Sequence, residues 1–114
     1  LKFMSLPIIN KIYEIYRDIV GLNHKLTKRW LYTLGMSLEN SVLDCMENLI
    51  MAKNAPKSLK AGYLIQASGK LETANLKLRL LLELELVNET VIFQIQAELE
   101  EIGRMLGGWL KSVK

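Results

Sequence analysis

Four runs of apolar residues, spaced three and four positions apart, constrain the fold of this chain more than any other feature. This spacing follows the 3.6-residue turn of an α-helix and puts each run on one helix face. Strand-like alternation competes only in LELELV, which lies inside a longer helical run, and in TVIFQI, which is short. In chain order, the runs are Ile8, Ile12, Ile15, Tyr16 and Ile19; Leu31, Leu34, Leu38, Val42, Cys45, Leu49 and Ala52; Leu64, Ala67, Leu71, Ala74, Leu78 and Leu81; and Ile92, Ile95, Leu99, Ile102, Leu106 and Trp109.

Residues typical of turns and helix ends separate the four runs. Pro7 suits the first turn of a helix, because its missing N–H would have no partner there. We expect that helix to end at Gly21, and we interpret the following GLNHKLTKRW as a basic connection. The third helix is predicted to follow the turn NAPKS, with Ser58 as its N-cap, and Asn88-Glu89 is predicted to form the turn before the fourth helix.

Four amphipathic helices with short connections predict an all-α fold, an antiparallel up-down-up-down four-helix bundle. The length of 114 residues predicts a single domain over residues 1–114. Because the sequence begins at Leu1 rather than at Met, we expect it to be the ordered core of a longer chain. No apolar run approaches the roughly 20 residues of a membrane span, so we predict that the protein does not enter a membrane. A single cysteine excludes an internal disulfide framework, and we therefore predict a cytoplasmic protein.

The candidate groups for catalysis are few and scattered. Cys45 lies in an apolar run, which favours a buried structural thiol, and the only histidine, His24, falls in the predicted first connection. Glu39, Asp44 and Glu47 have the spacing of a solvated helix face rather than of an acid/base pair. One cysteine and one histidine give no cluster with metal-ligand spacing. We therefore predict no catalytic residue, no metal and no cofactor, and a protein that is not an enzyme.

A second apolar stripe runs along the third predicted helix. Leu76, Leu80 and Leu84 lie on a different flank from the core run of that helix. Half of the residues of the chain are hydrophobic, which is high for a soluble domain. A helix of a lone antiparallel bundle buries one face, so the extra stripe predicts contact between subunits of a homo-oligomer.

Basic residues recur on the predicted helices and in the first connection. The net charge of +3 permits an anionic partner without requiring one. One interpretation is a surface that contacts nucleic-acid phosphates, with Trp30, Tyr32 or Tyr63 stacking on bases. The alternatives are a solvated charged surface, aromatic side chains that act as packing wedges, and pairing of Arg79 with Glu83. The candidate nucleic-acid-binding residues are Lys25, Lys28, Arg29, Lys70, Lys77, Arg79, Arg104 and Lys111.

The closing stretch EIGRMLGGWLK carries three glycines within a helical run. Gly103 and Gly107 are four positions apart and share a helix face, so they can let another helix approach closely, while Trp109 stays on the core run. Gly35, inside the second predicted helix, is a first indication of the same device. The alternative is that Gly107 and Gly108 end the helix as a C-cap. Gly103, Gly107 and Trp109 thus join Leu76, Leu80 and Leu84 as candidates for an oligomer interface or close helix packing.

EIGRMLGGWLK resembles the C-terminal helix of the accessory variability determinant proteins of diversity-generating retroelements. YTLGMSLE, residues 32–39, is similar to the start of the second helix of that family, and KLETANLKLRLLLELELV, residues 70–87, to its third helix, with a leucine-rich core around Arg79. These four-helix-bundle proteins form a wider group with those encoded in intervening sequences of 23S ribosomal RNA genes. The Gly-Arg-x-Leu-Gly-x-Trp ending favours the retroelement branch.

The resemblance implies a non-enzymatic protein that forms a ring of five subunits. It implies a positively charged surface that binds the reverse transcriptase of the retroelement and its template RNA or an RNA/DNA hybrid, and so supports mutagenic copying. The net charge of +3 is lower than is common in that family, which implies weaker or partner-dependent RNA binding. The rival interpretation is a structural or interaction protein of the ribosomal intervening-sequence type, without a retroelement role.

Overall fold

A computed structural model describes residues 2–114 of the chain, with side chains from Pro7 onward, and confirms the all-α prediction. The described residues form helices and turns, and none of them forms a strand, so the strand alternative for LELELV and TVIFQI is wrong. The elements are α1 (Lys2–Asn23), α2 (Lys28–Trp30), the π-helical turn η1 (Leu31–Gly35), α3 (Met36–Asn54), α4 (Lys57–Glu83) and α5 (Glu89–Ser112).

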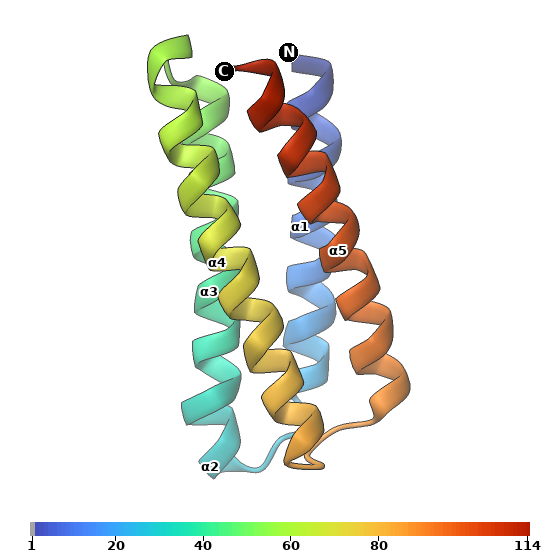
Figure 1. Ribbon diagram of the computed structural model, residues 1–114. Coiled ribbons are helices and arrows are strands. Elements are labelled where there is room, and N and C mark those ends of the chain that lie inside the picture. Colours follow the sequence, from blue (N-terminus) through green and yellow to red (C-terminus); the bar gives the residue numbers. More distant parts are fainter. Residues whose placement is uncertain (1) are drawn as a thin grey trace.

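The four long helices lie side by side in an elongated molecule of 43 × 23 × 19 Å (Figure 1). Helix α1 contacts α3 and α5, and α4 contacts the same two helices. Figure 1 shows the two termini at one end of the molecule, and α2 and the connection between α4 and α5 at the other end. This arrangement is compatible with a helical bundle around one core.

The core contains the four apolar runs that the sequence predicts, together with Leu22, Leu26 and Val113, which lie outside the runs. All six members of the third run and all six of the fourth are buried. In the first run, Tyr16 is half-buried, and in the second, Leu31 and Leu34 are half-buried because they lie at the end of the bundle. The apolar spacing therefore identified which face of each long helix is turned inward.

Several predicted helix boundaries are wrong by a few residues. Helix α1 begins at Lys2 and ends at Asn23, so Pro7 lies inside it rather than in its first turn. Helix α4 begins at Lys57 after an extended Pro56, which places Ser58 inside the helix instead of at its N-cap. The Asn88 side chain does cap α5, because its Oδ1 accepts a hydrogen bond from the Thr90 N–H at 2.8 Å.

A glycine in η1 makes the closest contact between helices that the structure describes for any glycine. A Cβ added to Gly35 would lie 3.1 Å from both Asn23 Oδ1 and Leu26 Cδ1. Asn23, which is fully buried, donates hydrogen bonds to the Gly35 carbonyl oxygen at 2.9 Å and to Glu39 Oε2 at 2.8 Å. The close packing indicated by Gly35 is therefore confirmed, between the end of α1 and η1.

The closing glycines behave differently. Helix α5 continues through Gly107 and Gly108 to Ser112, so the C-cap alternative is wrong. A Cβ on Gly103 would make an ordinary contact of 3.8 Å with Leu71, and a Cβ on Gly107 would meet nothing within 4 Å. Trp109, by contrast, is only 2% exposed and packs in the core of its own chain. Close approach at Gly107 thus stays a prediction for contact with a second molecule.

Candidate functional site

Helices α3 and α4 carry large apolar side chains on the sides that face away from the core. On α3, Met36, Leu43 and Ile50 are seven residues apart, a spacing that keeps them on one helix face. On α4, the predicted stripe residues Leu76 and Leu80 are exposed together with Ile65. We call these residues the outer apolar face; each is 40–59% exposed. The outer apolar face consists of Met36, Leu43, Ile50, Ile65, Leu76 and Leu80.

The third member of the predicted stripe, Leu84, is also exposed, but it is the C-cap of α4 rather than part of the helix. After it, Glu85 adopts a left-handed backbone conformation with φ of 57°, which turns the chain toward α5. Leu84 therefore lies at the edge of the outer apolar face, in the connection between two helices.

The opposite side of the molecule is polar. Among the described side chains, α1 and α5 expose one large apolar residue each, Tyr13 and Phe93. The Nζ of Lys11 on α1 forms an ion pair with Glu101 on α5 at 3.1 Å. The exposed apolar area of the molecule is thus concentrated on the α3 and α4 side, which is the pattern of an interaction surface rather than of scattered single residues.

Three of the predicted nucleic-acid-binding residues, Lys70, Lys77 and Arg79, form hydrogen bonds or ion pairs with other residues of the chain. Lys77 Nζ donates to the Ser37 carbonyl oxygen at 3.1 Å and to Ser41 Oγ at 2.7 Å, and it joins α4 to α3. Its pKa is lowered by burial first and by the charge of Lys70 second, while Asp44 opposes this shift. Lys70 pairs with Asp44 at 3.5 Å.

Arg79 pairs with Glu83 one turn further along α4, at 3.4 Å between Nε and Oε2. This confirms the pairing that the sequence indicated as an alternative to nucleic-acid contact. Arg79 and Glu83 are both well exposed, so the ion pair stabilises the helix only weakly and leaves Arg79 accessible.

A shallow open groove of about 410 Å³ lies above the contacts between α3 and α4. Most side chains that line the groove are polar. Lys70 and Lys77 line it from α4, Asn40 from α3 and Tyr32 from η1. Asp44 pairs with the charge of Lys70, whereas Lys77 is held by the neutral Ser37 carbonyl and Ser41 hydroxyl, so among the described side chains the groove retains one unpaired positive charge that is fixed in place by hydrogen bonds.

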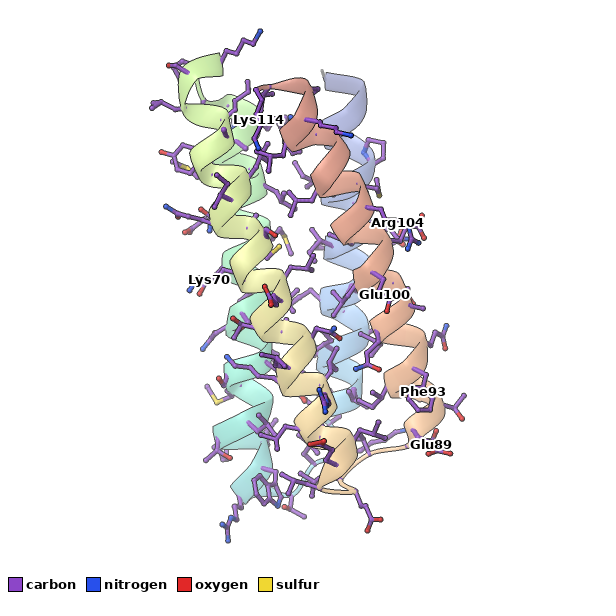
Figure 2. All side chains as sticks on the ribbon, viewed as in Figure 1. Lys70, Glu89, Phe93, Glu100, Arg104 and Lys114 are labelled. Atoms are coloured by element: carbon purple, nitrogen blue, oxygen red, sulfur yellow. The ribbon has the colours of Figure 1, made fainter. Side chains whose placement is uncertain are left out.

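The remaining candidates are exposed but do not form one surface. Lys25, Lys28 and Arg29 lie at the α2 end of the molecule, and Lys28 and Arg29 begin a helix instead of belonging to a connection as predicted. Arg104 and Lys111 lie on α5. Figure 2 shows Lys70 on the α4 edge and Arg104 on the α5 edge, on opposite sides of the view.

The potential nucleophile Cys45 is buried, and two of the three candidate carboxylates, Glu39 and Asp44, form contacts with other residues of the chain. Cys45 is buried, and burial raises its pKa to about 12, so the thiol stays protonated at neutral pH. Of the predicted solvated carboxylates, Glu47 is exposed, whereas Glu39 accepts a hydrogen bond from Asn23 and Asp44 pairs with Lys70. The part of the chain that the structure describes holds no group of three potential metal ligands, and it contains no helix suited to crossing a membrane.

Two features were not predicted from the sequence: the α3 half of the outer apolar face and the contact of the buried Asn23 with Glu39. The α3 half of the outer apolar face was detectable, because Met36, Leu43 and Ile50 repeat every seven residues. The contact between Asn23 and Glu39 had no sequence signal, because it joins two residues that are 16 positions apart and lie on different helices. Comparisons of the chain with protein-family models and with curated proteins found no match.

Proposed function

We propose that this chain is a non-enzymatic, self-assembling accessory protein of a diversity-generating retroelement. In this proposal it acts in the cytoplasm as a homo-oligomer, a pentamer by resemblance, and binds the reverse transcriptase and template RNA. The observation that carries the proposal is the outer apolar face, since it sets one side of the molecule apart for contact with protein. The exposed Lys25, Lys28 and Arg29 supply the charge for RNA.

The proposal includes a bundle in which the helices run alternately up and down as a single domain. Three observations support it: the connections are short, each of the four long helices contacts two others, and the termini lie at one end in Figure 1. In such a bundle the outer sides of α3 and α4 belong to neighbouring helices, so the six residues of the outer apolar face lie on the same side of the molecule, with the polar groove of Asp44, Lys70 and Lys77 between the two helices.

Replacing Leu76 and Leu80 by Lys is expected to yield monomers that keep their helical structure. The two side chains are exposed in the single chain, so charging them removes an interface without disturbing the core. Light scattering coupled to gel filtration measures the mass, and circular dichroism measures the helix content. The matched control replaces Tyr13 and Phe93 by Lys on the polar side and should leave the oligomer intact. Unchanged assembly of the Leu76 and Leu80 variant would remove the outer apolar face as the interface.

Binding to partners provides the direct test of the proposed function. We expect the oligomer to bind RNA with an affinity that falls steeply as salt rises, and to be recovered in a pull-down with the reverse transcriptase of the same locus. Gel shifts over a salt series measure the affinity for RNA, and a pull-down with purified proteins measures binding to the reverse transcriptase. If the protein bound neither RNA nor the reverse transcriptase at low salt, the retroelement role would be refuted.

The second candidate is a structural or interaction protein of the ribosomal intervening-sequence type. The ion pairs of Lys70 with Asp44 and of Arg79 with Glu83 favour it, because a carboxylate of the chain offsets each of these two positive charges. The genomic neighbourhood separates the two candidates. A reverse transcriptase gene with a template and variable repeat pair supports the first, and an intervening sequence in a ribosomal RNA gene supports the second.

A further inference from the structure

One end of the molecule combines free positive charge with aromatic side chains. We call it the tip; it consists of Lys25, Lys28, Arg29, Trp30 and Tyr32. The three basic residues are exposed, and no ion pair of the described side chains includes them. The tip includes α2, which Figure 1 shows at the end of the molecule opposite to the two termini.

The aromatic residues of the tip are presented in two ways. Trp30 is half-buried and packs against the core, which anchors it. The guanidinium carbon of Arg29 lies 5.0 Å from the centre of the Trp30 ring, within the range of a cation–π contact. Because Arg29 is exposed and one side of it faces the Trp30 ring, its planar group can receive a base on its other side. Tyr32 is 64% exposed, the largest exposure of the large apolar and aromatic side chains described.

At the opposite end of the molecule, the described side chains supply charge without an exposed aromatic residue. Lys53, Lys57 and Lys114 are exposed there, at the end of α3, at the start of α4 and after α5. The nearest aromatic residues in the sequence, Tyr63 and Trp109, are half-buried and buried. The two ends therefore share a basic character but differ in their capacity for stacking.

We infer that the tip binds single-stranded nucleic acid, with Tyr32 and Arg29 stacking on unpaired bases and Lys25 and Lys28 contacting phosphates. This inference rests on the proposed RNA-binding function and specifies its site and the form of the nucleic acid. Base faces are accessible in single strands but stacked inside a duplex, so exposed aromatic and guanidinium planes favour single strands. Stacking tolerates any base, so the binding is expected to depend little on sequence.

The first test replaces Lys25, Lys28 and Arg29 together by Ala and measures binding of a labelled 20-nucleotide oligouridylate by gel shift. Loss of two phosphate contacts and one stacking contact is expected to weaken binding on the order of 100-fold at 0.1 M salt and to lower the salt slope by about 1.4. The matched control replaces Lys53, Lys57 and Lys114 by Ala, which removes the same charge from the other end, and should change the affinity much less. Equal weakening by the two variants would overturn the tip as the site.

The second test separates stacking from charge. Tyr32→Ala is expected to weaken oligouridylate binding by about tenfold or more, since stacking on one base contributes that much. It should leave binding of a double-stranded RNA of the same length unchanged. Tyr13→Ala, on another exposed tyrosine, is the control. Equal loss on single and double strands would overturn the stacking role, whereas a wild-type chain that binds no RNA would refute the proposed function itself. Circular dichroism and mass measurement confirm that each variant is folded and assembled.

Discussion

Trp109→Ala is expected to lower the free energy of unfolding by about 3–5 kcal/mol, the range for removing a buried large aromatic side chain. Trp109 is 2% exposed and is the largest of the fully buried side chains, at the end of the last apolar run. Stabilities of ordinary domains are about 5–15 kcal/mol, so this single change is expected to remove a large fraction of the total stability. Urea denaturation followed by circular dichroism measures the change.

Two further variants identify burial as the cause. Trp109→Phe retains most of the apolar volume and should recover more than half of the lost stability. Trp30→Ala removes the other tryptophan, which is half-buried at the tip, and is expected to cost clearly less than Trp109→Ala. Equal losses for the two Ala variants would show that Trp109 does not occupy the core as described.

Gly35→Val is expected to cost about 2–3 kcal/mol, because the added atoms overpack the contact between η1 and α1. The Cβ alone would lie 3.1 Å from Asn23 Oδ1, and Asn23 cannot move away without losing its hydrogen bonds to the Gly35 carbonyl oxygen and to Glu39. A buried polar group that loses its partners costs a further 1–3 kcal/mol, on the order of the strain itself. The measurement is again the free energy of unfolding in urea.

Gly21→Val is the control for this substitution. Gly21 lies on an exposed position of α1, and an added Cβ there would meet no atom within 4 Å. Replacement of a helical glycine by valine is slightly favourable for the helix, so Gly21→Val should be neutral or stabilising by a few tenths of a kcal/mol. Destabilisation of similar size at both positions would mean that helix geometry, rather than the contact with Asn23, sets the effect.

The core could be predicted from the sequence because it depends on a local period. In runs such as Leu64 to Leu81, every apolar residue at the expected spacing is buried, since a long helix has one inward face whatever its neighbours are. The helix ends were less predictable. The break in apolar spacing and the basic character of GLNHKLTKRW predict a connection, but lysine and arginine are good helix formers, and Lys28 and Arg29 begin a helix.

The candidate site could be predicted only in part, because its residues are engaged by neighbours that the sequence does not identify. The spacing of Lys70 and Lys77 correctly puts both on one face of α4. It does not reveal that this face is turned to α3, where Asp44 and Ser41 hold them. The contact between Asn23 and Gly35 likewise joins two helices across a turn, and no local pattern encodes it.

The π-helical turn η1 also determines the direction in which the tip side chains that precede it point around the helix axis. A turn of this kind amounts to an α-helix with one residue inserted, and each residue advances an α-helix by about 100°. Lys28 and Arg29 precede η1 in the chain. Their side chains are therefore rotated about the helix axis by about 100° from the direction they would have if α3 continued back to them as an uninterrupted α-helix. Removing one residue between 31 and 35 would leave the core run of α3 in register while turning the basic side chains to another side of the bundle. A related chain without this turn should align with a one-residue gap here, and its tip would face a different neighbour.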